Sequence, residues 1–316
     1  MTEGFIHHPV LVELIVELFR PVPPGVVVDT TVGGGGHARA ILEARDDLTL
    51  VAIDRDLDAL AAAADRLAPF GERITLRHAR FDALEAIMTD LHDPPVSGVL
   101  FDLGVSSPQL DRADRGFSYR QSGPLDMRMD RTEERNAADV VNAYDEVRLI
   151  ATLKAGGEDR HAERIARAIV AARPIETTSE LAAVVAAAIP APARRRGGHP
   201  AKRTFQAIRI EVNRELALLA PALNEAIDIT QEGGRVVVMS YHSGEDRITK
   251  DVFRTAATGG CTCPPGLPCV CDAVQTVRLV KAGAWKATPS EIAANPRAES
   301  VRVRAIEKIA PRPRRA

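Results

Sequence analysis

Aspartates and glycines in the first third of the chain are spaced as in a nucleotide-binding site. Asp29 closes a run of valines, and the glycines Gly33 to Gly36 follow it before a helical pattern. Glycines at such a turn let the backbone approach a ligand closely, and the N–H groups of the helix start point at that ligand. Asp54 and Asp102 end two further apolar runs. If these runs are parallel strands, the three aspartates converge on one crevice at the carboxyl edge of a sheet.

The glycine run alone leaves the ligand open. Read as Gly33-x-Gly35-x-x-Ala38, with Asp54 further along, it also fits the fingerprint of a dinucleotide-binding fold. A tight strand-to-helix turn without any ligand is another interpretation, and each aspartate could instead cap the helix that follows it. The acidic rim favours a cofactor with an ammonium, a ribose and a sulfonium, because carboxylates repel a pyrophosphate. S-Adenosylmethionine fits that description better than a dinucleotide.

The elements that must position these residues alternate between strand and helix. β-Branched runs predict strands over 26–29, 48–54, 74–78 and 98–102. Helical patterns lie between them over 38–45, 57–67 and 83–91. Alternation of this kind predicts βαβ units, and the right-handed crossover rule then gives an α/β fold with a doubly wound parallel sheet.

The alternation stops after Asp102. The next convincing strand covers 235–240, whereas a βα connection normally takes about two to six residues. Helical patterns cover 137–153, 162–172, 179–189 and 204–219, and later strands cover 277–280 and 301–304. We therefore predict a sheet domain in two parts, 1–111 and 213–310, with an inserted helical domain over 112–212 and a disordered basic tail over 311–316.

The composition of the chain excludes several classes of protein. The chain has 316 residues, of which 45% are hydrophobic and 27% charged, so it is not a mostly disordered chain. The net charge of −2 excludes a globally basic protein, and any nucleic-acid surface must be local. No apolar run approaches the roughly 20 residues that cross a bilayer, and the first residues do not resemble a secretory signal. We expect a cytoplasmic protein without membrane contact.

One local basic segment stands out against this balance. Between Arg194 and Arg214 the chain carries seven basic residues and a single acid, Glu211. Such an excess is the pattern expected for phosphate contacts, although a solvated helix flank is the alternative. The basic residues are Arg194, Arg195, Arg196, Lys202, Arg203, Arg209 and Arg214.

The cysteines are clustered in one short segment. Cys261 and Cys263 form one pair and Cys269 and Cys271 another, which does not resemble a disulfide framework. Four thiolates could bind zinc, but structural zinc sites usually separate each pair by two to four residues. The sequence thus predicts no metal for the chemistry and keeps the cluster only as a weak zinc candidate. Reduced thiols or a redox-labile loop are the alternatives.

Several long motifs together resemble one protein family. They lie at 8–11, 29–37, 52–56, 102–111, 115–118, 123–130, 199–209 and 240–243. The chain resembles, over nearly its whole length, the MraW or RsmH family of bacterial methyltransferases. That family modifies N4 of a cytosine in the decoding region of 16S ribosomal RNA. Gly244 and Glu299 depart from the family pattern, and neither touches the glycine run.

The resemblance implies a Rossmann-like class I methyltransferase sheet with an inserted helical domain, and S-adenosylmethionine as the cofactor. It implies ribose contacts for Asp54 and a place beside the adenine for Phe81. Spacing alone does not lead to Phe81, His37 or Gln109. The full set of expected cofactor residues is Gly34, Gly35, Gly36, His37, Asp54, Phe81, Asp102 and Gln109.

The implied reaction needs an acceptor for the protons of an exocyclic amine, whose lone pair is conjugated into the pyrimidine ring. Amino methyltransferases in general place this acceptor after the fourth strand, where this chain has the segment 102–105. Our hypothesis is that the Asp102 carboxylate or the Leu103 carbonyl accepts the proton. The base must be turned out of any helix, and Phe117 and Tyr119 could stack on it or simply pack in the insert.

Other classes stay open at this point. A dinucleotide-dependent oxidoreductase would use the same glycine run, and a non-catalytic RNA-binding protein could keep the same fold. The partner implied by the resemblance is 16S ribosomal RNA, within the small subunit or as naked RNA. An apolar face on the inserted domain would also be compatible with a homodimer.

Overall fold

The structure is a computed structural model that describes residues 9–194, 198–264 and 270–313. The chain divides into two compact units. The first comprises Met1–Gly104 and Leu218–Ala316, and the second comprises Val105–Ala217. These boundaries differ by a few residues from the expected insertion at 112–212. Arg195, Arg196 and Cys269 lie outside the described residues.

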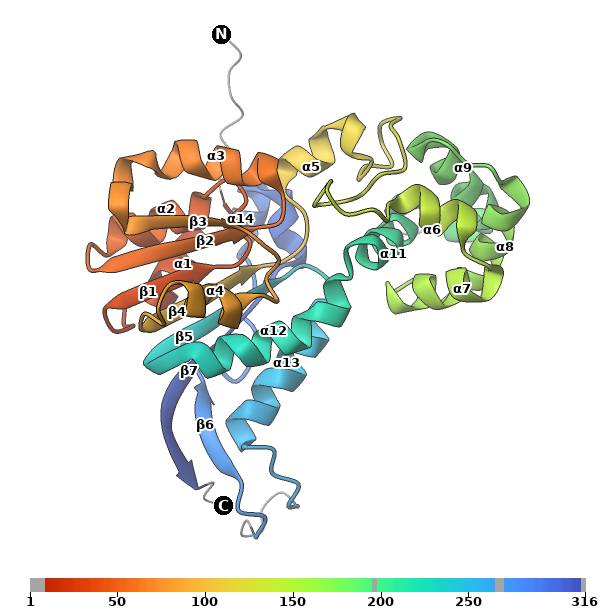
Figure 1. Ribbon diagram of the computed structural model, residues 1–316. Helices are drawn as coiled ribbons and strands as arrows, with labels where there is room; N and C mark the ends of the chain where they lie inside the picture. The colour runs from red at the N-terminus through yellow and green to blue at the C-terminus, as the bar shows by residue number, and fades with distance from the viewer. Residues whose placement is uncertain (1–8, 195–197, 265–269, 314–316) are drawn as a thin grey trace. The chain divides into compact units, whose positions relative to one another are not determined.

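The first unit is built on a seven-stranded sheet with the order β3-β2-β1-β4-β5-β7-β6 (Figure 1). Strands β1 to β5 are parallel, and β7 is antiparallel to both β5 and β6. The predicted α/β fold with a doubly wound sheet is confirmed, except that β7 is antiparallel to its neighbours. The strands are β1 (Gly25–Asp29), β2 (Leu48–Asp54), β3 (Ile74–His78), β4 (Val96–Asp102), β5 (Thr230–Ser240), β6 (Val274–Leu279) and β7 (Arg302–Pro313).

Helices cover both faces of this sheet, which explains why its central strands are almost entirely apolar. Successive side chains of β1 enter opposite layers. Val27 packs in the core with residues of α1, α2 and α3, whereas Val26 and Val28 pack with residues of α4, α12 and α13. These helices are α1 (Val12–Phe19), α2 (Gly36–Ala44), α3 (Leu57–Leu67), α4 (Leu84–Asp90), α12 (Glu215–Ile229), α13 (Ser243–Thr258) and the short α14 (Pro289–Ala294).

One glycine inside β4 is required by this packing. A Cβ on Gly98 would lie 2.4 Å from Cε1 of Phe19, whose ring in α1 is fully buried over the strand. Real Cβ atoms do not approach another heavy atom so closely. Gly98 therefore allows α1 to cover the centre of the sheet.

The second unit is helical and has its own hydrophobic core, to which nearly all of its helices contribute. Thr177 caps α9 and Asn136 caps α6, each through a reciprocal capping box that fixes where the helix begins. Its helices are α5 (Ser107–Asp111), α6 (Ala137–Ala143), α7 (Glu146–Ala155), α8 (Ala162–Ala172), α9 (Thr178–Ala188), α10 (Ala191–Arg194) and α11 (Lys202–Asn213).

Two long helices expected from the sequence are each divided in two. The pattern over 137–153 contains a break, because Tyr144 is extended and Asp145 caps a new helix through the Arg148 N–H group. The pattern over 204–219 ends at Arg214, which adopts a left-handed φ of 55°. Periodicity continues across both breaks, so it could not reveal them.

The carboxyl-terminal strand is longer than expected. We predicted a disordered tail from Pro311, but β7 continues to Pro313 and pairs there with Val274 of β6. Residues 314–316 lie outside the described part. Within the described residues, no helix is both long and apolar enough to span a bilayer.

Candidate active site

The aspartates predicted from spacing lie at the carboxyl edge of the first unit's sheet. Asp29 ends β1, Asp54 ends β2 and Asp102 ends β4, and both β2 and β4 pair with β1 in parallel. The charges of Asp54 and Asp102 each raise the pKa of Asp29, so the three carboxyl groups act on one another. The edge is therefore acidic, as the sequence indicated.

The glycine loop between β1 and α2 is tied to this edge. Gly33 has a φ of 51°, and its N–H group donates to Oδ2 of Asp54 over 2.9 Å. Gly35 caps α2 with a φ of 74°, and a Cβ there would lie 3.2 Å from Cγ of Leu67. Gly34 has no atom within 4 Å of the position a Cβ would take. The loop thus leaves open space at Gly34, where a ligand can approach the backbone.

Gly36 has a different role in this loop. A Cβ on Gly36 would lie 2.3 Å from Cγ of Pro9, so the amino-terminal segment packs directly on the start of α2. This contact accounts for the glycine through packing alone.

Backbone N–H groups already donate hydrogen bonds to both carboxylate oxygens of Asp54. Its Oδ1 accepts the Asp56 N–H group over 2.9 Å, and its Oδ2 accepts the Gly33 N–H group. Asp56, and not Asp54, caps α3. Each carboxylate oxygen can accept a second hydrogen bond, so Asp54 keeps acceptor capacity for a ligand hydroxyl.

Burial makes two of these carboxyl groups hard to ionise. It raises the pKa of Asp29 to about 7, against the lowering effect of His37. It also raises the pKa of Asp54 to about 6, although the Asp56 and Gly33 N–H groups lower it. A ligand that brings positive charge or hydrogen-bond donors to this edge would favour the ionised forms.

Each oxygen of the Asp102 carboxylate has a side-chain partner. The Tyr241 hydroxyl donates to its Oδ1 over 2.8 Å, and Nδ1 of His37 lies 3.4 Å from its Oδ2. The backbone N–H group of Asp102 donates to Oγ1 of Thr31. Its side chain is 27% exposed, so the fixed carboxylate still reaches solvent. This geometry suits a carboxylate that must meet a substrate in one orientation.

The Asp102 carboxylate shifts the pKa values of both side chains that contact it. Burial and the charge of Asp102 raise the pKa of Tyr241 well above its usual value, so the phenol remains a donor. Burial lowers the pKa of His37, but the hydrogen bond and charge of Asp102 outweigh it and the net shift is upward. Nε2 of His37 faces the Val10 carbonyl oxygen at 2.8 Å, which can only accept. A doubly protonated His37 satisfies both neighbours.

The structure gives His37 a role beside the cofactor contact implied by the resemblance, and that contact stays a prediction. Its side chain is only 6% exposed, and its two ring nitrogens face Val10 and Asp102. In this structure His37 positions Asp102.

The backbone that follows Asp102 is fixed by the neighbouring strand. The Leu103 N–H group donates to the Met239 carbonyl oxygen over 3.0 Å, and Gly104 then turns the chain with a φ of 99°. No described residue donates a hydrogen bond to the Leu103 carbonyl oxygen. That oxygen is an available acceptor next to the Asp102 carboxylate.

Two other expected cofactor residues are largely buried. Phe81 packs in the core of the first unit, with its ring 6.1 Å from the Phe101 ring in an edge-to-face arrangement. Gln109 belongs to the second unit, and its Oε1 accepts the Ser106 N–H group at the start of α5. Phe81 thus packs in the hydrophobic core of the first unit, and the Gln109 side chain helps to cap helix α5.

Tyr241 was not identified as a functional residue from the sequence, although it lies in a quoted motif. Its backbone N–H group donates to Oε2 of Glu245, a buried residue in the first turn of α13. Its place directly after β5 was the available signal, because β5 pairs in parallel with β4 and so ends at the same edge. A sequence reading could not show that the phenol turns toward Asp102.

In the second unit, the two aromatic residues expected to stack on a base differ. Phe117 is buried in the helical core, with the Arg115 guanidinium 5.8 Å from its ring centre. This burial favours the packing alternative, and a stacking role for Phe117 stays a prediction. Tyr119 is half-buried and stacks on the exposed His199 ring, with centroids 4.4 Å apart and an interplanar angle of 15°.

The basic segment is weaker than its residue count indicated. Arg209 forms a two-pronged ion pair with Glu215, at 2.9 Å for each contact, and this acid lies just past the counted window. Lys202 and Arg203 are exposed at the start of α11. Arg194 ends α10, and Arg195 and Arg196 lie outside the described residues.

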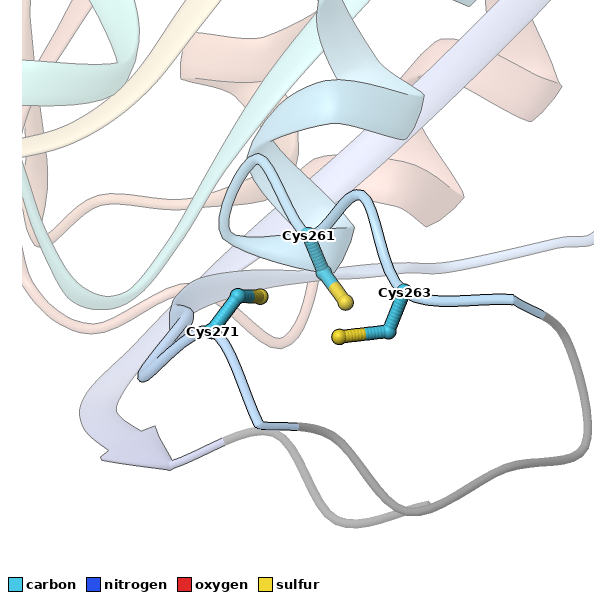
Figure 2. A group of neighbouring side chains, drawn as sticks. All are labelled: Cys261, Cys263 and Cys271. Atoms are coloured by element: carbon cyan, nitrogen blue, oxygen red, sulfur yellow. The ribbon is translucent and has the colours of Figure 1, made fainter.

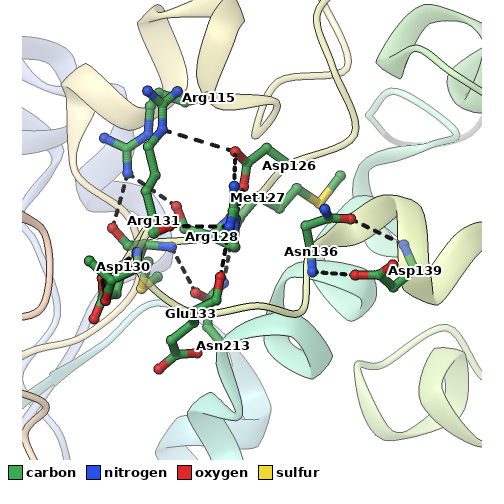
Figure 3. Close-up of polar contacts among 12 residues, drawn as sticks. Arg115, Asp126, Met127, Arg128, Asp130, Arg131, Glu133, Asn136, Asp139 and Asn213 are labelled. Carbon is green, nitrogen blue, oxygen red and sulfur yellow. Dashed lines mark hydrogen bonds and ion pairs between the residues drawn. The ribbon is translucent and has the colours of Figure 1, made fainter.

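A strained loop between η2 (Ala113–Arg115) and α6 is clamped by buried polar contacts (Figure 3). Met127 is fully buried with a φ of 58°, a conformation that side chains other than glycine rarely adopt. Asn213 accepts the Met129 N–H group and donates to the Met127 and Arg209 carbonyl oxygens. Arg115 donates to the Arg128 and Met129 carbonyl oxygens. These contacts hold a backbone that would not be stable alone.

Comparisons with known proteins agree over most of the chain. A model of the MraW methylase family matches residues 4–309. A protein of Thermobifida fusca is 52% identical over 96% of this chain and 93% of its own length. Relatives from Mycobacterium sp. (strain KMS), at 50% over 97% and 85%, and Symbiobacterium thermophilum, at 47% over 97% and 98%, are similar. All three are named ribosomal RNA small subunit methyltransferase H.

Proposed function

The chain belongs to the MraW methylase family, and we propose that it methylates ribosomal RNA of the small subunit with S-adenosylmethionine as donor. The proposed target atom is N4 of a cytosine in the decoding region of 16S ribosomal RNA. One observation carries the chemistry: the Asp102 carboxylate is held between Tyr241 and His37.

The other classes fit less well. The dinucleotide-binding fold has the classic strand order 3-2-1-4-5-6, whereas this sheet carries the antiparallel β7 between β5 and β6. The acidic edge also opposes a pyrophosphate. A non-catalytic RNA-binding protein would have no need of a carboxylate fixed by two buried partners.

The residues at the sheet edge fit S-adenosylmethionine by their chemistry. Open backbone at Gly34 and the remaining acceptor capacity of Asp54 suit a nucleoside with free ribose hydroxyls. The buried Asp29 carboxyl group suits a nearby cationic group. We assign cofactor binding to these three residues together with Gly35, Gly36, Phe81 and Asp102, all of which belong to the first unit. The cofactor supplies an electrophilic methyl group on a sulfonium.

The protein's own contribution to the transfer is proton acceptance and alignment. A cytosine amino group offers two N–H donors, and Asp102 and Leu103 offer a carboxylate and a carbonyl oxygen side by side. Hydrogen bonds to both would draw the nitrogen out of conjugation and direct its lone pair. The carboxylate takes the proton as the new bond forms, while Tyr241 keeps donating to its other oxygen.

The second unit supplies the RNA surface in this proposal. The stacked pair of Tyr119 and His199 lies on the same unit as the exposed Lys202 and Arg203, three to four residues from His199 in sequence. Aromatic faces bind unstacked bases and cations bind phosphates, which suits an irregular RNA region. Arg194, Arg195 and Arg196 stay predicted RNA contacts from the sequence, and Arg195 and Arg196 lie outside the described residues.

We place the reaction in the cytoplasm, with the assembled small subunit as substrate. A homodimer through the helical unit is the weaker part of the proposal. Among the described residues of that unit, Val147 and Val170 are its exposed large hydrophobic side chains. Two exposed side chains provide less apolar surface than a stable interface usually buries.

Cofactor binding should release protons. Asp29 and Asp54 have pKa values of about 7 and about 6, and the bound cofactor favours their ionised forms. About one proton should therefore leave per site near pH 6.5, and affinity should rise as pH increases from 5.5 to 7. Calorimetry in buffers of different ionisation enthalpy measures this. Affinity that falls over that range, or binding without proton release, would contradict the assignment.

The same shifts have a consequence for the protein without cofactor. Because both pKa values are raised by folding, the folded state binds more protons than the unfolded state between about pH 4 and 7. These two groups therefore lower stability as pH rises through that window. The thermal stabilisation by cofactor should accordingly be larger at pH 7 than at pH 5.5.

Neutralising Lys202 and Arg203 together should reduce the salt dependence of RNA binding. Each phosphate contact to single-stranded RNA contributes about −0.7 to the slope of log K against log salt. The double variant Lys202→Gln and Arg203→Gln should therefore have a slope that is less steep by about 1.4. Binding to unmodified small subunits at several salt concentrations measures the slope. Lys154→Gln, on exposed α7, is the matched control and should leave the slope unchanged. An unchanged slope in the double variant would remove these residues from the RNA surface.

The proposed function is tested by transfer of labelled methyl from S-adenosylmethionine. We expect label in small subunits that lack the modification and none in large subunits. Label in naked 16S RNA alone would move the substrate to an earlier stage of assembly. No label in any RNA, with intact cofactor binding, would contradict the proposed function.

A further inference from the structure

Three cysteine side chains from the two ends of one loop point toward one another (Figure 2). Cys261 and Cys263 follow α13, and Cys271 precedes β6. Their sulfur atoms all lie within 4.8 Å of one another. None of the three forms a disulfide bond. The sequence spacing argued against a metal site, because each pair is too close together, but the fold brings thiols from both pairs into one cluster.

The base of this loop is fixed by the backbone. Gly259 and Gly260 end α13 with φ values of 62° and 71°, and a Cβ on Gly259 would lie 2.4 Å from the Val274 carbonyl oxygen. The start of β6 therefore lies directly against the end of α13. The Cys261 N–H group donates to the Thr258 carbonyl oxygen, and this hydrogen bond fixes the backbone position of Cys261. The three thiols therefore belong to a loop whose two ends, at α13 and β6, are in contact.

The thiol of Cys263 also has the environment of a metal-bound sulfur. The backbone N–H group of Val270 donates to its Sγ over 3.4 Å. Hydrogen-bond donors to a ligand atom orient it, so this contact fixes where the Cys263 sulfur lies. Cys261 and Cys263 are separated by one residue, a spacing that places both side chains on the same side of an extended chain.

Two described residues beside the cluster face solvent. The Val270 side chain is 83% exposed, and Cys271 is exposed as well. A bound ion would tie these exposed residues to the ends of α13 and β6.

We propose that Cys261, Cys263 and Cys271 bind a zinc ion. Zinc prefers thiolates in tetrahedral geometry at about 2.3 Å, which separates neighbouring sulfurs by about 3.8 Å. The sulfurs need to close by no more than about 1 Å to reach this arrangement. Three deprotonated thiols are the ligands, their protons are released on binding, and water or another ligand takes the fourth position. The assignment rests on these three residues; Cys269 lies outside the described part.

The site is structural and separate from methyl transfer. α13 begins at the carboxyl end of β5, beside Tyr241, and runs back across the sheet before Cys261. The cysteines therefore lie at the edge opposite the aspartates. The ion would join α13 to β6 and so support the sheet edge formed by β6 and β7. This proposal does not depend on the proposed function.

Metal analysis of the full chain tests the site. After incubation with zinc chloride under reducing conditions and desalting, the wild type should hold about one zinc ion per chain. Cys263→Ser and Cys271→Ser should each hold less than about a tenth of that, since a two-thiolate site is weak. Val270→Ala keeps the backbone donor and every thiol, and should retain zinc like the wild type.

A spectroscopic measurement covers the case in which a serine variant folds poorly. Cobalt(II) added to the wild type should give an intense visible absorption and a thiolate charge-transfer band, both typical of tetrahedral sulfur ligation. Zinc should displace both signals. Wild-type protein without zinc and without these bands would overturn the proposal, as would a Cys271→Ser variant with full zinc content. Preferential retention of iron or copper over zinc would overturn the choice of metal.

Discussion

Asp102→Asn should lower kcat about a thousandfold, within the 10² to 10⁴ range for losing a general base. The amide keeps the size of the carboxylate but cannot take a proton from the cytosine amine. It also disturbs the clamp, because Tyr241 and His37 both present donors to the carboxylate oxygens. Single-turnover methyl transfer to unmodified small subunits measures the chemical step apart from product release.

Two controls separate chemistry from binding in this experiment. The affinity of Asp102→Asn for the cofactor should change less than about tenfold, so the loss appears in kcat. Tyr241→Phe removes one hydrogen bond and leaves the carboxylate, so its kcat should fall only about tenfold. Near-normal kcat in the asparagine variant would transfer the acceptor role to the Leu103 carbonyl oxygen.

Asn213→Ala should destabilise the helical unit by about 2 to 4 kcal/mol, as expected when several buried backbone groups lose their partners. Asn213 is 1% exposed and makes hydrogen bonds to the Met129 N–H group and to two carbonyl oxygens. Its loss also releases Met127 from a left-handed conformation that is unfavourable on its own. Denaturant unfolding followed by far-ultraviolet circular dichroism reports on the helices.

The chain offers matched controls for this prediction. Its single tryptophan, Trp285, lies in the first unit, so tryptophan fluorescence reports on the sheet separately. Lys202→Ala changes an exposed residue of the same helix and should alter stability by less than about 0.5 kcal/mol. A circular dichroism transition of Asn213→Ala that matches the wild type would show that the clamp contributes little.

The centre of the sheet could be predicted from the sequence because β1, β2 and β4 are largely apolar runs that end in aspartates. Strand β2 and helix α3 begin and end where the pattern indicated. In the second unit, the predictions over 162–172 and 179–189 match α8 and α9 to within one residue, whereas those over 137–153 and 204–219 each join two helices. Their periodicity continues through Tyr144 and Arg214, where local backbone conformation breaks it.

The candidate site could be predicted in part for a related reason. Spacing along strands places Asp29, Asp54 and Asp102 at one edge, because parallel strands share that edge. It says nothing about which way a side chain turns after the strand. The link from Tyr241 to Asp102 joins residues 139 positions apart, and the His37 contact to Val10 spans 27. Such contacts depend on tertiary packing and have no local signal.

Charge counting over the basic segment failed for a similar reason. The window ended at Arg214, one residue before Glu215, which pairs with Arg209. A window also cannot distinguish exposed cations such as Lys202 and Arg203 from a buried ion pair. The burial of Phe117 likewise follows from the helical core, which a list of aromatic residues does not reveal.

Identification of the methylated nucleoside tests the central claim most directly. Small subunits labelled by the enzyme are digested to nucleosides, and the labelled product is compared with methylated cytidine standards. An acceptor pair formed by Asp102 and Leu103 predicts N4-methylcytidine. Label in 5-methylcytidine or in a ribose-methylated nucleoside would contradict the account, because neither reaction uses an acceptor for amine protons.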